Sequence, residues 1–194
     1  MHLDDRQRAG LFLFAGTTQF AIGLIIAEAV DPTYSVSLNY ISDLGIRAGA
    51  PIFNGSIILL GLTILLTSWY LYRAFKDRIL MIVVFIAGIG AIGVGVFTED
   101  FDIIHSVFSF ITFVFAALSA ILAFRILRPP LSYLSILLGV ASLAALGLYV
   151  SKNFLGLGKG GMERMIVYPV LAWGIGLGGY LLGMSAAKEP SAPS

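Results

Sequence analysis

The sequence predicts an all-α fold: an integral membrane six-helix transmembrane bundle with a short interfacial helix in the first outer loop. Three observations lead to this fold class. Of the 194 residues, 58% are hydrophobic and 12% are charged, which is more apolar surface than one water-soluble core buries. The apolar residues gather in six runs of about 20 residues, the length that crosses a bilayer. These runs are continuous and do not alternate as barrel strands do, so helices are favoured.

We expect a single transmembrane domain over residues 1–194, with spans of about 10–30, 52–72, 79–97, 103–124, 131–151 and 164–186. In the first span, Ala27-Glu28-Ala29 resembles the small-x-small site of a cleaved signal peptide. The apolar run is longer than a typical signal core, and Asp4 and Asp5 dilute its positive start, so a retained anchor is expected. We expect the Glu28 carboxylate to reach the outer interface; the alternative is that it turns into the bundle.

The basic residues of the short loops predict the orientation. With a cytoplasmic N-terminus, eight Lys and Arg residues fall inside and four fall outside. The inner ones are Arg6, Arg8, Arg73, Lys76, Arg78, Arg125, Arg128 and Lys188, and the outer ones are Arg47, Lys152, Lys159 and Arg164. Both termini are therefore predicted to lie in the cytoplasm, with the chain in the cell membrane.

The first outer loop, residues 31–50, is too long to be structureless. Ser37 is a suitable cap for a helix over residues 38–44, and Gly45 is a suitable stop. Leu38, Ile41 and Leu44 then form one apolar stripe, while Asn39 and Asp43 share the polar face. This pattern indicates a helix that lies at the membrane interface. Pro51 then opens the second span at its first turn.

Small residues recur at four-residue spacing in two spans. The third span contains Ala87, Ala91 and Gly95, and the sixth contains Gly174 to Gly178 and Gly179 to Gly183. Such spacing allows helix backbones to approach closely, so we interpret these residues as packing contacts. Pro169, early in the sixth span, is expected to kink that helix and shape a pocket beneath the outer surface.

The last outer loop, residues 156–164, is rich in glycine and leads into the sixth span. Backbone amides at a helix N-terminus bind anions, here with support from Lys159 and Arg164. The spacing does not match a Walker A motif. A flexible connector explains the same glycines, and that alternative stays open.

Several polar residues converge on the predicted outer surface. Asp102 and His105 are three residues apart on one helix face, with Ser106 and Ser109 below, and Arg164 and Tyr168 are stacked on the sixth span. We expect one polar depression ringed by Asp43, Glu99, Asp102, His105, Glu163 and Arg164, with Asn54 and Tyr168 in its floor. The alternative is that Asp102 and Glu163 only occupy the first turns of their helices, as acidic residues commonly do.

The composition excludes several kinds of chemistry. The chain has no cysteine and two histidines, so disulfides, thiolate metal sites and bis-histidine haem are not expected. Asp102-x-x-His105 resembles half of a carboxylate-bridged metal site, but the second half is missing. We therefore expect no metal and no cofactor. The net charge of +1 gives no indication of nucleic-acid binding, and membrane lipids are the expected partners.

Four motifs carry a resemblance to a known family. They are residues 34–45, residues 51–54, residues 95–100 with His105, and residues 161–164 before Tyr168-Pro169. Their order and spacing resemble the prokaryotic six-helix membrane proteins catalogued as domain of unknown function 998. In the usual bacterial form the third motif is similar to Phe-Pro-Thr-Asp-Pro, whereas here it has no proline. The resemblance implies the fold and the membrane location and brings no established activity.

Three functions remain open. The first is a protein whose outer pocket binds a lipid headgroup or a small anionic or zwitterionic ligand through Arg164, Lys159 and the neighbouring acids. The second is a membrane-embedded hydrolase of lipid-like substrates, with His105 as general base, Asp102 or Glu99 orienting it, and Ser106 or Ser109 as nucleophile. The third is a transporter or a structural subunit of an assembly, although the middle of the membrane is poor in polar residues.

Overall fold

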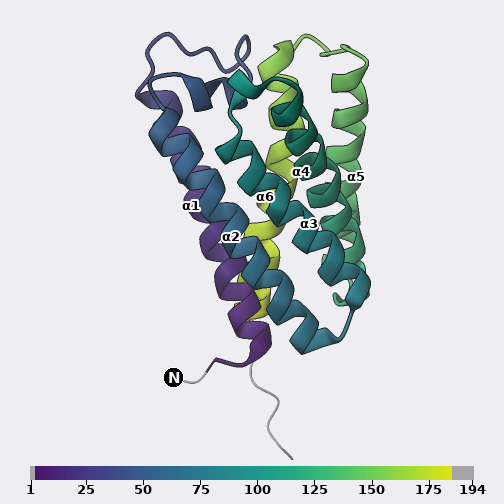
Figure 1. Cartoon of the computed structure of the whole chain (residues 1–194). Helices are drawn as coiled ribbons and strands as arrows, with labels where there is room; N and C mark the ends of the chain where they lie inside the picture. The colour runs from purple at the N-terminus through teal and green to yellow at the C-terminus, as the bar shows by residue number, and fades with distance from the viewer. Residues whose placement is uncertain (1–2, 185–194) are drawn as a thin grey trace, which may run out of the picture.

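The computed structural model describes residues 3–184 as a bundle of six long helices (Figure 1). The helices are α1 (Asp5–Ala29), α2 (Ala50–Phe75), α3 (Arg78–Val96), α4 (Ile103–Leu122), α5 (Leu131–Val150) and α6 (Gly158–Gly183). Three short 3₁₀ helices join them: η1 (Ser42–Ile46), η2 (Glu99–Phe101) and η3 (Ala123–Arg125). Residues 3–184 contain no strand. The predicted all-α six-helix bundle is confirmed.

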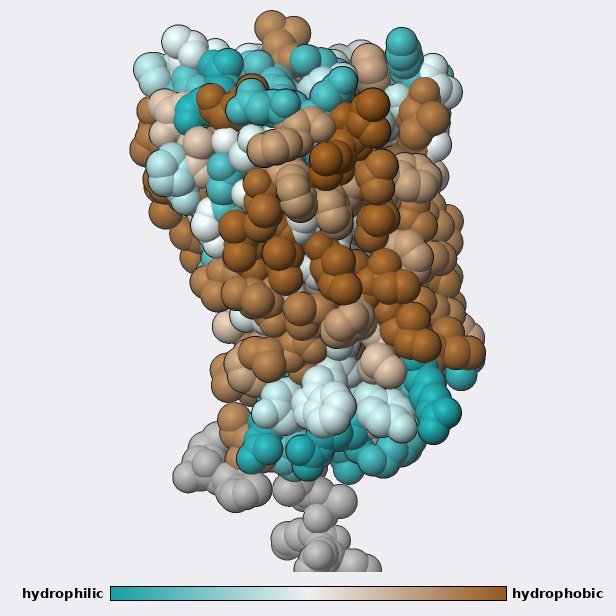
Figure 2. All heavy atoms as spheres, viewed as in Figure 1, coloured by the Kyte–Doolittle hydropathy of each residue, from teal (hydrophilic) through white to brown (hydrophobic). Residues whose placement is uncertain are grey.

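Each of the six helices is long and apolar enough to cross a membrane. On the face in view, Figure 2 shows a broad hydrophobic belt bounded by hydrophilic surface at both ends of the bundle. Large apolar side chains such as Ile25, Trp69 and Leu137 are exposed on this belt. A water-soluble protein does not expose so much contiguous apolar surface, whereas lipid is the matching solvent for it.

The helices form a ring in chain order, and α6 closes the ring against α1. Glycine makes this closure possible. A Cβ on Gly178 would lie 2.6 Å from the Phe14 backbone nitrogen, and one on Gly10 would lie 2.7 Å from the Gly178 oxygen. The predicted packing role of Gly174 and Gly178 is therefore confirmed. Gly179 and Gly183 have no atom within 4 Å of a Cβ, so their predicted packing role is wrong.

We call the end of the bundle that holds residues 30–49, 97–102 and 151–157 the outer end, after its expected orientation. The first outer loop, residues 31–50, differs from its prediction. Instead of an α-helix over residues 38–44, the loop forms turns followed by the short 3₁₀ helix η1. Ile41 and Leu44 are buried as expected, but Leu38 is 69% exposed. The reason is that Ser37 does not cap a helix: its carbonyl accepts a hydrogen bond from Gly160 and its hydroxyl donates to the Leu157 carbonyl. The Ser37 groups that would start a local helix are therefore bonded to residues at the start of α6.

The opposite end of the bundle holds the start of α1 and the end of α6. A capping box between Asp4 and Gln7 starts α1 five residues earlier than the apolar run does. The Gln7 side chain also donates to the Met184 carbonyl. Asp77 caps α3 and pairs with Arg125, which joins the two connections at this end. Lys188, counted in the orientation prediction, lies outside the described residues.

Candidate functional site

Arg164 is the most heavily bonded side chain at the outer end of the bundle. It is buried in α6, and its guanidinium donates to the Glu28 carboxylate, the Tyr34 hydroxyl, and the carbonyls of Val36 and Gly160. Glu28 therefore turns into the bundle and does not reach the interface as expected. The Tyr34 hydroxyl in turn donates to the Tyr40 carbonyl. Arg164 thus ties α1, α6 and the first outer loop together.

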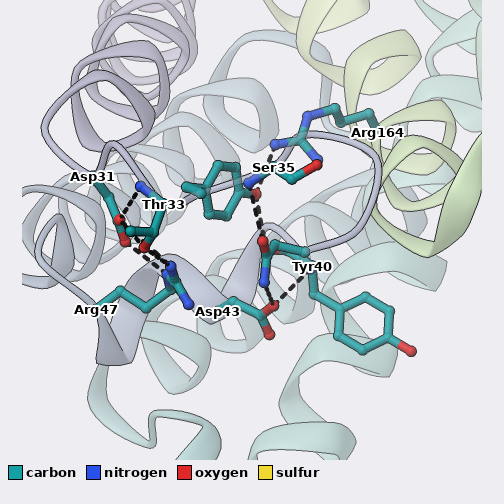
Figure 3. A network of polar contacts seen from close by, with 9 residues as sticks. Asp31, Thr33, Ser35, Tyr40, Asp43, Arg47 and Arg164 are labelled. Atoms are coloured by element: carbon teal, nitrogen blue, oxygen red, sulfur yellow. Dashed lines mark hydrogen bonds and ion pairs between the residues drawn. The ribbon is translucent and has the colours of Figure 1, made fainter.

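Figure 3 shows Arg164 and two further groups of contacts that hold the first outer loop. In one group Arg47 donates to Asp31 and Thr33, and the hydrogen bond from Arg47 lowers the pKa of Asp31 to about 2. In the other group the Asp43 carboxylate accepts hydrogen bonds from the Asn39 side chain and the Tyr40 amide, at 2.9 and 3.0 Å. Asn39 and Asp43 were expected to share one polar helix face; they do lie together, although the α-helix expected to carry them is absent.

The glycine-rich start of α6 packs against the first outer loop. The Gly160 amide donates to the Ser37 carbonyl at 3.0 Å. A Cβ on Gly160 would lie 1.9 Å from the Asn39 oxygen, and one on Gly158, whose φ is +75°, would lie 2.4 Å from the Ser37 oxygen. These glycines admit the backbone of the first outer loop. The Gly160 amide is therefore bonded to the first outer loop and is not free for the expected anion site.

A polar pocket of about 180 Å³ lies between the short helices and the outer ends of α4, α5 and α6. Its polar lining comes from η1 (Ser42), η2 (Glu99), α4 (His105, Ser106, Ser109), α5 (Tyr149), α6 (Glu163) and the loop residue Tyr40. Phe110, Phe113, Leu146 and Val150 complete the wall. The structure thus brings three of the sequence-predicted site residues, Glu99, His105 and Glu163, into one hollow.

The pocket has an acidic character. The Glu99 carboxylate accepts a hydrogen bond from the Ser42 hydroxyl. Burial of this carboxylate, together with the nearby Asp43 carboxylate, raises the pKa of Glu99 to about 7 against the opposing effect of Ser42. Glu163 is buried, and its carboxylate accepts the Ile41 amide at 2.6 Å. Lys159 lies beside the pocket: its amine lies 4.0 Å from the centre of the Tyr40 ring, and its charge acts on Glu99.

His105 and Ser109 form a hydrogen-bonded pair in the pocket wall. His105 Nδ1 lies 2.7 Å from the Phe97 carbonyl, and His105 Nε2 lies 3.2 Å from Ser109 Oγ. A carbonyl oxygen only accepts, so we assign the ring proton to Nδ1 and let Nε2 accept from the Ser109 hydroxyl. Thr112 and Ser119, on the same helix, instead donate to their own backbone carbonyls.

Six of the predicted site residues do not line the pocket. Two of them, Asp43 and Lys159, are described above, and the other four lie as follows. Asp102 is exposed, caps α4 without a side-chain bond and has a φ of +40°, so it neither caps through its carboxylate nor orients His105. Tyr168 is 45% exposed on the outside of the continuous helix α6, so it does not form the expected floor of the depression. Asn54 donates to the Gly45 carbonyl and anchors η1 to α2. Arg164 bonds within the protein through Nη1 and Nη2, its buried Nε has no partner, and it does not line the pocket.

Other pocket residues were missed by sequence reasoning. Ser42, Tyr40 and Tyr149 line the hollow, and none of them stands out in its own segment. The pairing of Glu28 with Arg164 was also missed, although two opposite charges within apolar spans are a usable signal for a partner. Among residues 3–184, no group of three or more His, Asp or Glu side chains is arranged to hold a metal ion.

Fold and pocket together define a multi-pass membrane protein, a six-helix bundle with a polar hollow at one end. Residues 14–180 match the family described as "Protein of unknown function (DUF998)". The chain belongs to this family, as the four sequence motifs indicated. No curated protein and no solved structure gives a match.

Proposed function

We propose that the polar pocket binds the headgroup of a lipid-like ligand, and that this headgroup carries hydrogen-bond donors such as an ammonium group. The observation that carries the proposal is the pair of carboxylates, Glu99 and Glu163, in the wall of one hollow at the level where headgroups lie. Carboxylates accept and do not donate when ionised, so they select donors and positive charge. The rings of Tyr40 and Tyr149 offer further favourable contact to a cation.

The distribution of positive charge favours a zwitterionic over a purely anionic headgroup. Arg164, the expected anion ligand, is bonded to Glu28, Tyr34 and two carbonyls, and an anion would have to displace one of these partners. Lys159 lies next to the pocket against Tyr40 and is the group suited to a phosphate on the same ligand. A headgroup with an amine near a phosphate satisfies both the acids and Lys159.

Binding measured in lipid nanodiscs of defined composition tests this proposal. We expect purified protein to retain phosphatidylethanolamine over phosphatidylglycerol, and Glu99→Gln and Glu163→Gln to reduce that preference about tenfold or more, the worth of one charge-assisted contact of about 1.4 kcal/mol. Asp100→Asn is the matched control, because Asp100 is an exposed acid next to Glu99 that does not line the pocket. Equal affinity for both lipids, or loss in the control alone, would refute the proposal.

A second candidate function is hydrolysis of a lipid-like ester, and the Ser109–His105 hydrogen bond favours it. In this mechanism Ser109 Oγ attacks the ester carbonyl while His105 Nε2 takes its proton, and the Phe97 carbonyl orients the ring by accepting from Nδ1–H. The ester C–O bond then breaks, His105 passes the proton to the leaving alcohol, and water hydrolyses the acyl-Ser109. A fluorophosphonate probe tests the nucleophile: labelling of the wild type that Ser109→Ala removes and Ser106→Ala retains is expected. Absence of labelling in the wild type would count against the hydrolase and leave the binding proposal untouched.

The third part of the proposal is the orientation. The excess of Lys and Arg in the loops at one end supports a cell-membrane protein with cytoplasmic N- and C-termini and an outward-facing pocket. The chain has no cysteine, so single cysteines can be introduced without background. We expect Asp100→Cys to react with a membrane-impermeant maleimide on intact cells and Lys76→Cys to react only after lysis. The reverse pattern would overturn the orientation.

A further inference from the structure

A second cavity, of about 100 Å³, lies inside the helix ring. Its walls come from α1, α2, α3, α4 and α6, and nearly all of them are apolar side chains such as Phe20, Phe53, Leu60 and Leu171. A volume of about 10–15 Å³ on this measure already holds one water molecule. The interior of the bundle is therefore not close-packed and has room for a ligand group larger than a water molecule.

The cavity is long and narrow. On α2 it is lined by Phe53, Ile57, Leu60, Ile64, Thr67 and Leu71. These residues recur every three or four positions and form one stripe that extends over 18 residues, or about 27 Å at 1.5 Å per residue. That length approaches the hydrocarbon thickness of a bilayer, about 30 Å. A small volume distributed over such a length matches the shape of one extended hydrocarbon chain.

The chemistry of the walls favours hydrocarbon over water. The hydroxyls of Thr17, Thr67, Thr112 and Ser119 line the cavity, and each donates to a carbonyl of its own helix, at 2.6 to 2.9 Å. Water in a cavity needs two to four free polar partners, and apolar cavities without them stay dry and take apolar guests. Over most of its length the cavity offers no such partners.

The two cavities adjoin. Ser42, Ser109, Phe113 and Glu163 line both the polar pocket and the apolar cavity. The Glu163 carboxylate therefore stands at the boundary between the acidic hollow and the hydrocarbon-like interior. A ligand whose headgroup meets Glu163 has its apolar part directly beside the entrance to the ring.

We infer that the central cavity takes the hydrocarbon chain of the ligand, so that the protein binds a single-chain amphiphile with a donor-bearing headgroup. The inference rests on the proposed headgroup site. The inference narrows the class of ligand, because this cavity has room for one hydrocarbon chain. The second chain of a two-chain lipid would lie outside the ring.

Trp173 provides the test, since this buried residue lines the cavity. The other tryptophan, Trp69, is exposed and can be replaced by Trp69→Phe to leave a single reporter. A lysophosphatidylethanolamine with a brominated chain is the probe, and the chain-free headgroup glycerophosphoethanolamine is the competitor. We expect saturable quenching of Trp173 fluorescence, at least tenfold weaker in apparent affinity after Ala116→Leu, which fills the cavity from α4.

The matched control is Ala144→Leu, an exposed alanine on α5 outside the cavity. Ala91→Leu is the second cavity-filling variant if Ala116→Leu does not fold. If the protein binds the headgroup but Trp173 quenching is equal in Ala144→Leu and in both cavity-filling variants, the chain site alone would be overturned. Saturable quenching that the filled variants abolish, but that neither Glu99→Gln nor the headgroup competitor changes, would support the chain site and overturn the headgroup site.

Discussion

Replacing Arg164 by methionine removes the buried guanidinium that joins α1, α6 and the first outer loop. Met matches the length of the aliphatic stem but donates nothing, so Glu28, Tyr34 and two carbonyls lose a partner. Breaking a buried ion pair on one side costs about 3–5 kcal/mol, because the remaining charge is left without compensation. We expect Arg164→Met to lower the free energy of unfolding by this amount.

A double-mutant cycle separates the energy of the Glu28–Arg164 ion pair from the packing of the two side chains. Glu28→Gln leaves Arg164 with its other acceptors and is expected to cost about 1–3 kcal/mol. The double variant Glu28→Gln/Arg164→Met removes both charges, so its cost should fall short of the sum of the single costs by about 2 kcal/mol. Arg73→Met is the control, because its pair with Asp5 is half exposed and such pairs contribute about 1 kcal/mol or less.

Thermal unfolding in detergent, followed by tryptophan fluorescence, measures these differences. A Tm for Arg164→Met as high as that of Arg73→Met would refute the view that Arg164 is the main tie at the outer end. Additive single costs in the double variant would show that Glu28 and Arg164 act independently despite their contact.

Three further outcomes are expected. The raised pKa of Glu99 means that folding favours its protonated form. The free energy of unfolding should therefore fall by about 1–2 kcal/mol, after discounting for partial exposure, as the pH rises from about 4.5 to about 7. Thermal unfolding measured against pH should show a flatter slope for Glu99→Gln. Gly160→Ala should cost about 3 kcal/mol or more, because its Cβ overlaps the Asn39 carbonyl, whereas Gly176→Ala meets no atom within 4 Å and should stabilise by up to about 1 kcal/mol. Asp102→Gly should stabilise by about 1 kcal/mol by relieving the φ of +40° and leave lipid binding unchanged; lost binding would restore a role for its carboxylate.

Local and one-dimensional properties of the chain were predictable. The six spans follow from runs of apolar residues, since lipid requires every backbone group to be bonded within its own helix. The contact of Asn39 with Asp43 follows from their spacing of four residues. The packing of Gly174 and Gly178 against α1 follows from the small-residue pattern.

The partners of the polar residues were not predictable, because they depend on how the ring closes. Ser37 has the pattern of a helix cap, yet its carbonyl and its hydroxyl bond to residues at the start of α6, more than a hundred residues later. Arg164 has the pattern of an outward-facing anion ligand, yet α1 brings Glu28 to it. His105 has Asp102 three residues away, yet the Phe97 carbonyl accepts the hydrogen bond from its ring, and Asp102 is exposed at the helix cap.

The membrane class, the helices and their number are therefore properties of the chain composition and its periodicity, which any sequence of this kind carries without reference to tertiary contacts. The polar pocket and the apolar cavity beside it exist only in the closed ring, since their shared wall combines Ser42, Ser109, Phe113 and Glu163 from three separate parts of the chain. Burial and pairing are properties of that arrangement. The folded ring makes Arg164 a structural tie and leaves Glu99 and Glu163 facing the pocket.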